Sequence, residues 1–247
     1  VNAQTNEKTQ FNIPLNAEED VTTHDFVRFV SPNQNNDDFN KNTNPQSISG
    51  IKLNFDLDIT PDAEVQLIFD SKIGDIIRSR GYGAIKLEIN TAGKFNMFSD
   101  YTITEGDYLF TLKNIINKKF TVEEGSYISW NGEPMDANIN IKANYNTKAK
   151  LSNLFPEESE GNSEKSDFYN TRIPVECQIE MTKRLVNPEL AFAINLPTAD
   201  PETRTRVASS INTEEELSKH FLSLLVINSF MVDPNRVSPN QNYQGSY

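Results

Sequence analysis

Apolar and polar residues alternate through most of residues 80–151. Ile85, Leu87 and Ile89 would share one face of an extended chain, and the polar residues beside them would share the other. Successive side chains of a β-strand point to opposite faces, so a period of two predicts half-buried strands. Runs with the same period recur at 101–103, 108–112, 120–122, 128–130 and 137–145. This stretch therefore predicts an antiparallel meander with one apolar face.

The breaks between these runs carry residues that favour tight turns. Turns are predicted at Ala92-Gly93, Glu105-Gly106-Asp107, Glu124-Gly125-Ser126 and Asn131-Gly132. Asn-Gly is the strongest hairpin signal among them, because both residues tolerate the positive φ of a type I′ turn.

More strands are predicted on both sides of this stretch, at 51–59, 63–69, 173–181 and 190–196. Residues 70–80 are predicted to form a short helix, with Asp70 or Ser71 as N-cap, cationic side chains in the last turn and Gly81 as the stop. Segment 1–47 is expected to be a connecting segment, partly disordered. It holds candidate short strands at 11–15 and 25–30 and a polar loop at 33–47.

Beyond the strands the sequence changes to helical signals. Asp200 followed by Pro201 favours a helix start, and Thr213 with Glu216 three residues later forms a capping box. The second signal begins a helix predicted at 213–230. We expect four units along the chain: the connecting segment 1–47, a β-groove at 48–197 with an exposed acidic loop at 156–167, a helical segment at 198–232 and a flexible tail at 233–247.

The composition disfavours two kinds of partner, both of them negatively charged. The formal net charge is −12, and an acidic chain without basic clusters disfavours binding to nucleic acids or to anionic lipid headgroups. Only 36% of the residues are hydrophobic, which is adequate for a sheet with one solvated face. No apolar run reaches the roughly 20 residues that a spanning helix needs. Because the chain opens on Val1, we expect it to be a piece of a longer protein.

Candidate chemical groups are few. His24 and His220 are the two histidines, and both are expected at the surface. No nucleophile or metalloprotease motif accompanies them. Cys177 is the single cysteine and is expected to be a small buried hydrophobe. The sequence therefore predicts no enzyme, no catalytic residue and no cofactor.

Two local patterns have an alternative chemical interpretation. Asp56, Asp58 and Asp62 cluster oxygen ligands of the kind that hard cations prefer, but acidic residues on a solvated strand face also discourage edge aggregation. The second interpretation is favoured, so no metal site is predicted. The pattern Gly81-Tyr82-Gly83 is similar to a phosphate-binding loop, but it precedes a strand rather than a helix and carries no weight.

An ordered series of segments resembles a known family. The segments are GYGAIKLEINTAGKFNM, DYTITEGDYLFTL, KKFTV and ISWNGEPMDANINIKANY, flanked by FDLDITPDAEVQLIFD and TEEELSKHFLSLLV. Together they resemble the C-terminal region of the TamB family, AsmA-like translocation and assembly proteins of diderm bacteria, and most of all its Bacteroidetes branch. The resemblance covers about 48–230, and the acidic insert at 156–167 departs from it.

The resemblance implies an elongated U-shaped sheet, a "β-taco" with an apolar concave face. It implies a periplasmic protein, associated with the inner membrane through an anchor outside this chain and with the outer membrane. Such a protein moves phospholipid between the membranes, assists outer-membrane protein assembly with a TamA-like or BamA-like barrel, or does both. An extracellular β-sandwich that acts as an adhesin or carbohydrate-binding module is the alternative, since two facing sheets need the same alternation.

Two sets of residues are expected to carry the function. The residues expected to line a lipid-binding groove are Ile51, Leu53, Phe55, Leu57, Val65, Leu67, Ile85, Leu87, Ile89, Phe110, Leu112, Trp130, Ile139, Ile141, Val175, Ile179, Phe192 and Ile194. The apolar stripe of the last helix is expected at Leu217, Phe221, Leu224 and Leu225. This stripe either caps the groove within the chain or docks on a partner.

Overall fold

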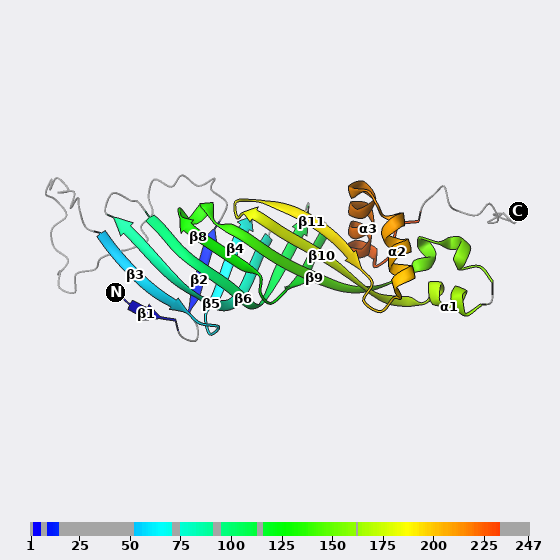
Figure 1. Cartoon of the computed structure of the whole chain (residues 1–247), viewed down its shortest axis with the longest axis horizontal. Helices are drawn as coiled ribbons and strands as arrows, with labels where there is room; N and C mark the ends of the chain where they lie inside the picture. Colours follow the sequence, from blue (N-terminus) through cyan, green and yellow to red (C-terminus); the bar gives the residue numbers. More distant parts are fainter. Residues whose placement is uncertain are drawn as a thin grey trace, which may run out of the picture.

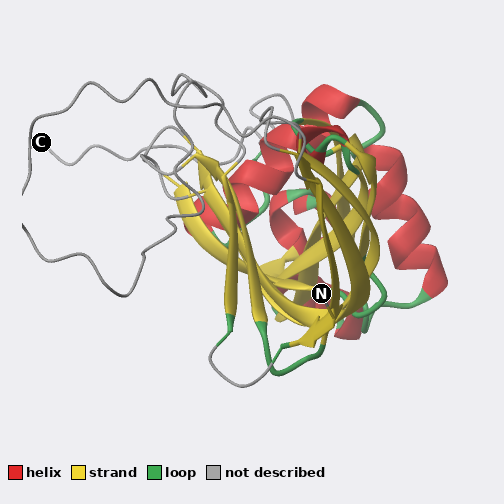
Figure 2. Ribbon diagram, turned by 90° about the vertical axis from the view of Figure 1, so that its left-hand side faces the viewer, coloured by secondary structure: helices red, strands yellow, loops and turns green. Residues whose placement is uncertain are grey.

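The computed structural model describes residues 2–5, 9–14, 52–70, 75–90, 95–112, 116–161 and 163–232. The molecule is elongated and mainly β, with its α-helices gathered at one end of the long axis (Figure 1). Seen along that axis, the sheet is strongly curved (Figure 2). The side chains buried within it are mainly apolar. The predicted fold class, an elongated and curved sheet with short helices near the C-terminal end, is confirmed.

Among the described residues, eleven strands form one sheet. The strands are β1 (Asn2–Gln4), β2 (Gln10–Pro14), β3 (Lys52–Ile59), β4 (Glu64–Asp70), β5 (Asp75–Asn90), β6 (Phe95–Leu112), β7 (Ile116–Val122), β8 (Tyr127–Gly132), β9 (Asn138–Lys150), β10 (Arg172–Arg184) and β11 (Asn187–Asn195). The α-helices are α1 (Glu164–Asn170), α2 (Pro201–Ser210) and α3 (Glu214–Ile227), and three short 3₁₀ helices are η1 (Pro134–Asp136), η2 (Leu151–Asn153) and η3 (Pro156–Glu158). None of these helices has the length and apolar content needed to cross a membrane.

The sheet runs in the order β1-β3-β5-β6-β7-β9-β10-β11. Strand β2 pairs with β4, β4 also pairs with β5, and β8 lies between β6 and β9. Pairing is antiparallel except for β1 with β3 and β2 with β4, which are parallel. Two pieces of segment 1–47, which the sequence suggested as a connection, are therefore strands of the sheet itself.

Alternation along the strands places one face inside. In β10 every second side chain is buried, namely those of Ile173, Val175, Cys177, Ile179 and Met181. Their neighbours along the strand are at least partly exposed. The inner face of the curved sheet is therefore the apolar face that the period of two predicts.

A line of strand interruptions runs across the sheet from β3 to β8, and we call it the seam; β9 and β10 continue past it in unbroken register. β3 and β4 lie end to end along β5 and are separated by the turn at 60–63. Likewise β7 and β8 lie end to end along β6 and are separated by 123–126. Between these two breaks the register of β5 and β6 shifts at Arg80/Gly81, where Thr104 is the extra residue of a β-bulge. The inner-facing positions of β6 change there from odd to even residue numbers.

Hydrogen bonds continue across the seam from strand to strand. The backbone N–H of Thr60 donates to Thr5 Oγ1 over 2.9 Å, and the Thr104 hydroxyl donates to the carbonyl of Arg80 over 3.1 Å. Gly125 N–H donates to the Ile103 carbonyl over 2.9 Å. These bonds satisfy backbone groups that the interrupted ladders leave open, so the sheet bends without exposing them to the apolar interior.

Three predictions about local structure are wrong. The helix predicted at 70–80 does not form, because residues 75–80 begin the long strand β5 and Ile77 and Ser79 point into the core. Glu105-Gly106-Asp107 is no turn, since it lies inside β6 beside the bulge. Asn131-Gly132 ends β8, but η1 follows it in place of a two-residue hairpin. Turn residues within a long bent strand mark the bend here, and burial of alternate residues outweighs local helix signals.

The acidic insert differs from the exposed loop that was expected at 156–167. It contains the 3₁₀ helix η3 and the first residues of α1. Ser163 caps α1 by a reciprocal capping box with Ser166. Glu158 of the insert binds Arg206 of α2, with Nη1 and Oε1 separated by 2.6 Å. Charge pairing therefore ties this segment to the helical end of the molecule.

Candidate apolar groove and its helical cap

Two cross-strand rows of apolar side chains extend the inner face over β3, β5 and β6. In one row Phe55 lies opposite Leu87, which lies opposite Met97. In the next row Leu53 lies opposite Ile89, which lies opposite Phe95. Side chains opposite each other on neighbouring strands are in contact distance, so each row forms a continuous apolar strip. We call these two strips the open rows.

The exposed fraction of the side chains on β6 rises from the first open row to the second, toward the end of the strand. Met97 is 6% exposed, whereas Phe95 is 40% exposed, although both point to the same face. Leu53, Phe55 and Ile89 are half-buried. An apolar surface left partly open beside a filled core is typical of a binding surface.

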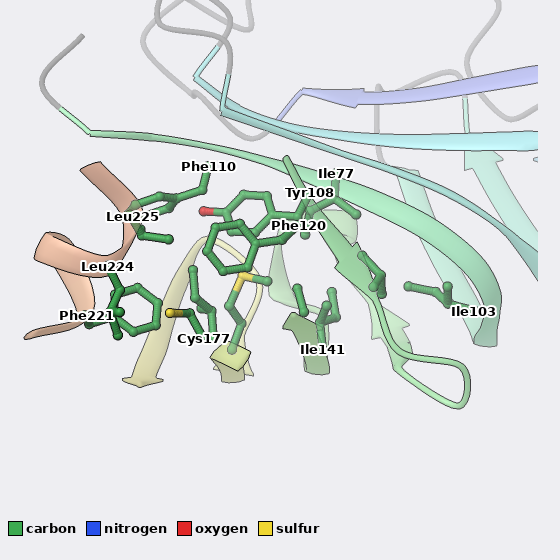
Figure 3. Packing of buried hydrophobic residues seen from close by; sticks show 14 of the residues in the cluster. Ile77, Ile103, Tyr108, Phe110, Phe120, Ile141, Cys177, Phe221, Leu224 and Leu225 are labelled. Carbon is green, nitrogen blue, oxygen red and sulfur yellow. The ribbon is translucent and has the colours of Figure 1, made fainter. Parts of the chain in front are cut away.

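Farther along the molecule, side chains fill the interior. Figure 3 shows Ile77, Tyr108 and Phe110 from one side of the interior approaching Cys177 and Ile141 from other strands. The rings of Phe110 and Phe120 meet edge to face with centroids 5.9 Å apart, and Tyr108 joins both. This part is a packed core in the structure.

The structure places the expected groove residues in two groups, with Ile51 outside the described residues. The half-buried group is Leu53, Phe55, Leu57, Leu87, Ile89, Leu112, Phe192 and Ile194. The buried group is Val65, Leu67, Ile85, Phe110, Trp130, Ile139, Ile141, Val175 and Ile179. Contact with a cargo stays a prediction for both groups, and the half-buried group is the one that a cargo reaches without opening the core.

Helix α3 closes one end of the apolar interior. Its N-cap is Thr213, whose hydroxyl accepts the backbone N–H of Glu216 over 3.2 Å, as the capping signal predicts. Phe221 lies between β7 and β11, with its ring 6.4 Å from that of Phe120 and 4.7 Å from that of Phe192. Leu224 and Leu225 are fully buried beside it (Figure 3). In this structure the expected docking stripe is therefore an intramolecular cap.

The chain after α3 fastens this cap to β9 and η2. Asn228 adopts a left-handed conformation and ends the helix, and its side-chain oxygen accepts the hydroxyl of Thr147 over 2.7 Å. The side-chain amide of Asn153 donates to the carbonyl of Phe230 over 3.3 Å. Phe230 itself is buried. Residues far apart in the sequence thus lock the helix to the end of the sheet.

His220 is buried under this returning segment, which corrects the expectation of a surface histidine. Its Nδ1 accepts the backbone N–H of Met231 over 3.2 Å, and its ring lies against that of Phe230. Burial lowers the pKa of His220, while the Glu216 carboxylate partly opposes that effect and Lys219 adds to it. An acceptor nitrogen that is held by a backbone N–H requires a neutral imidazole.

Arg206 anchors the helical end on its other side. Its guanidinium lies 4.6 Å from the ring centroid of Phe155 and also within reach of the Tyr169 ring. Glu158, paired with both Lys165 and Arg206, has its pKa lowered first by Lys165 and then by Arg206. Planar stacking combined with forked hydrogen bonding is the geometry that arginine serves best.

Two buried titratable groups stay neutral inside the sheet. Burial raises the pKa of Tyr101 to about 12, and its hydroxyl lies 3.4 Å from that of Ser79. Burial also raises the pKa of Cys177 to about 12. Among the described residues, no group of three or more metal-ligating side chains occurs. His24 lies outside the described residues.

Sequence reasoning missed several inner-face residues. Met97 and Phe95 were left out of the groove although their alternation continues that of 101–103. Phe120 was placed in a strand but not in the site, and only the tertiary approach of α3 and β11 gives it a central position. Phe11 and Ile13 of β2 also pack against the core.

Comparison with known proteins identifies the family. No curated protein matches the chain. The family model described as TamB C-terminal domain matches residues 1–244, a wider range than the 48–230 that the resemblance covered. That match spans nearly the whole chain and agrees with the curved sheet and its apolar inner face. The chain therefore belongs to the TamB C-terminal domain family of cell-envelope transport and assembly proteins.

Proposed function

We propose that this chain forms part of a periplasmic β-groove that receives phospholipid acyl chains at the open rows. The observation that carries the proposal is the change from buried Met97 to exposed Phe95 along one apolar face. An acyl chain laid on the open rows would continue the filled core and remove apolar surface from water, at about 25 cal/mol for each Å² covered.

The proposal includes transfer between the inner and outer membranes together with a TamA-type or BamA-type barrel. Two features support a protein partner at the helical end. Within the described sheet, β11 has β10 as its one neighbouring strand, so its other edge is available for strand addition. Val226 and Ile227 of α3 are exposed, whereas the inner stripe of that helix is buried. Docking through Phe221 or Leu225 would require release of the cap.

Photo-crosslinking tests the lipid contact. A crosslinking residue at Phe55 or Leu87 is expected to capture phospholipid in cells, whereas one at the outward-facing Asp58 or Lys86 is not. These positions are matched, because Asp58 and Lys86 lie on the same strands and point to the opposite face. Crosslinking at Phe110 is expected to be weaker, since that ring lies within the packed core.

A charge at the open rows gives a second readout. Leu87→Asp places an unpaired carboxylate on the proposed acyl path, which is costly in an apolar environment. We expect less phospholipid to co-purify with this variant, as measured by mass spectrometry of native extracts. Lys86→Asp is the control and should leave the lipid content unchanged. Equal lipid labelling of the inner and outer positions, or unchanged lipid content in Leu87→Asp, would contradict the proposal.

A further inference from the structure

Two exposed tyrosines lie in one row on the outer face of the sheet. Tyr82 of β5 lies opposite Thr102 of β6, which in turn lies opposite Tyr127 of β8. The neighbours of these residues in sequence, such as Tyr101 and Ile128, are buried in the core, so the row itself points outward. Tyr82 is 55% and Tyr127 is 45% exposed. We call Tyr82, Thr102 and Tyr127 the tyrosine row.

Large exposed aromatic side chains, such as those of the tyrosine row, are unusual on the outer face of the sheet. The outward positions along β3, including Lys52 and Asp58, are charged or strongly polar. The other large apolar side chains that are exposed among the described residues lie on the open rows, on the β10–β11 hairpin, or at the end of α3 and just after it. Two half-exposed aromatic side chains on a solvated face form a platform that the packing of the described residues leaves partly open.

A hollow of about 240 Å³ lies next to Tyr127, where the seam separates β7 from β8. Its lining residues are Glu123, Glu124, Gly125, Ser126, Tyr127, Asn140 and Lys142. Asn140 lies opposite Tyr127 and continues the tyrosine row onto β9. Hydroxyl, amide, ammonium and carboxylate groups therefore surround one end of the platform.

The spacing of the platform restricts the occupant. The backbones of the two tyrosines lie two strand spacings apart, roughly 10 Å. This distance is close to the disaccharide repeat of an extended β-1,4-linked glycan. In such a chain alternate sugar rings present an apolar C–H face that packs on an aromatic ring, and their hydroxyls reach outward to polar groups.

Other occupants fit less well. A nucleic acid or an anionic lipid headgroup would meet a chain with net charge −12 and no basic cluster at this site. A peptide added by strand pairing needs a free sheet edge, but β5, β6 and β8 each have neighbours on both sides. A neutral or weakly charged polymer with many hydroxyls suits both the rings and the hollow.

We propose that the outer face of the sheet binds an extended β-1,4-linked glycan chain on the tyrosine row, with the hollow beside Tyr127 taking the next sugar. This site lies on the face opposite to the open rows, so the proposal is independent of the lipid function. Such a contact would hold the molecule against a polysaccharide layer while the inner face stays free for its own cargo.

Calorimetric titration of the whole chain with a soluble β-1,4-linked N-acetylglucosamine oligomer tests the proposal. We expect saturable binding, weakened about tenfold by either Tyr82→Ala or Tyr127→Ala, as expected for the loss of one stacking contact. Tyr82→Phe with Tyr127→Phe keeps both rings and should retain binding. Phe95→Ala is the matched control, because it removes an exposed ring from the opposite face. All of these positions are exposed, so each variant should fold like the parent chain.

Sedimentation with insoluble polymers identifies the source of the glycan. Purified peptidoglycan sacculi and microcrystalline cellulose are the two arms. The proposal is supported if either polymer retains the native chain but not the double variant Tyr82→Ala/Tyr127→Ala. The polymer that retains the native chain is then the source of the glycan. Absence of binding to the oligomer and to both polymers, or binding that this double variant leaves unchanged, overturns it.

Discussion

The ring of Phe221 lies nearly parallel to that of Phe120, with centroids 6.4 Å apart and planes inclined by 22°. One residue comes from the last helix and the other from a strand in the middle of the sheet. The ring of Phe192, on β11, also packs against the ring of Phe221. Phe221 therefore joins separate parts of the curved sheet through one side chain. The closed end of the molecule depends on this junction.

Truncation of the junction should therefore destabilise the whole folded chain. Phe221→Ala is expected to lower the free energy of unfolding by about 3–5 kcal/mol, because it leaves a cavity in a packed site. Adding Leu225→Ala should abolish folding or leave a partly open state. Chemical denaturation measures the effect.

Ile227→Ala, on an exposed part of the same helix, should change stability by no more than about 0.5 kcal/mol. A stable double variant that no longer retains a barrel partner would show that the helix docks on that partner instead.

Acidification should loosen the cap through His220. Its pKa is lowered in the folded state, so the unfolded chain binds the proton more tightly. The stability contributed by the neutral ring is fully present above its ordinary pKa of 6.5 and is lost as the pH falls through that value toward the lowered pKa. We expect the thermal midpoint of the native chain to fall more steeply than that of His220→Gln between about pH 7 and about pH 5. Parallel curves for the two chains would rule out this contribution.

Removal of Arg206 should release the acidic insert from α2. Arg206→Ala loses the pairing with Glu158 and the stacking on Phe155, so it should lower the free energy of unfolding only slightly, because the site is partly exposed to solvent. Hydrogen exchange in α1 should become faster, with little change in β9 and β10. Arg206→Lys keeps the charge but not the planar fork, so it should give an intermediate result. If hydrogen exchange in α1 is as slow in Arg206→Lys as in the native chain, the positive charge alone holds the insert in place.

A methyl group at Gly81 should disturb the seam. A Cβ atom there would lie 2.0 Å from the backbone carbonyl oxygen of Thr102, and a backbone atom cannot move aside as a flexible side chain can. Gly81→Ala is expected to cost about 1–3 kcal/mol or more through overpacking. Ala84→Ser, at an exposed position of the same strand, is the control. An unchanged denaturation midpoint in Gly81→Ala would mean that the two strands separate easily at this point.

Much of the architecture was predictable from the sequence because alternation is a local property. The strand containing Phe55, the inward direction of Cys177 and the start of α3 at Thr213 all follow from neighbouring residues. The helix expected around Ile77 failed because adjacent apolar residues and a preceding Asp-Ser pair fit a helix as well as a strand, and only β4 and β6 on either side decide between them.

Long-range features were outside the reach of that reasoning. The burial of His220 depends on residues 228–231 returning over α3, and the seam depends on breaks in separate strands lying beside one another. The open rows were recognised in part, since Leu87 and Phe55 alternate correctly. The difference between open and filled regions depends on which elements lie across the interior, and no single strand carries that information.

The bulge at Thr104 also bears on how such a chain can change over evolutionary time. A one-residue insertion in an uninterrupted strand would turn every later side chain to the wrong face. Here β6 already absorbs one extra residue, and its inner positions resume with the opposite parity. Between β3 and β8 the strand segments on either side of the seam are thus registered separately, so the effect of an insertion or deletion in β6 near the seam is confined to a few residues. The strand segments on the two sides of the seam can therefore diverge in sequence and length between β3 and β8, while the uninterrupted pairing of β9 with β10 keeps both sides in one sheet.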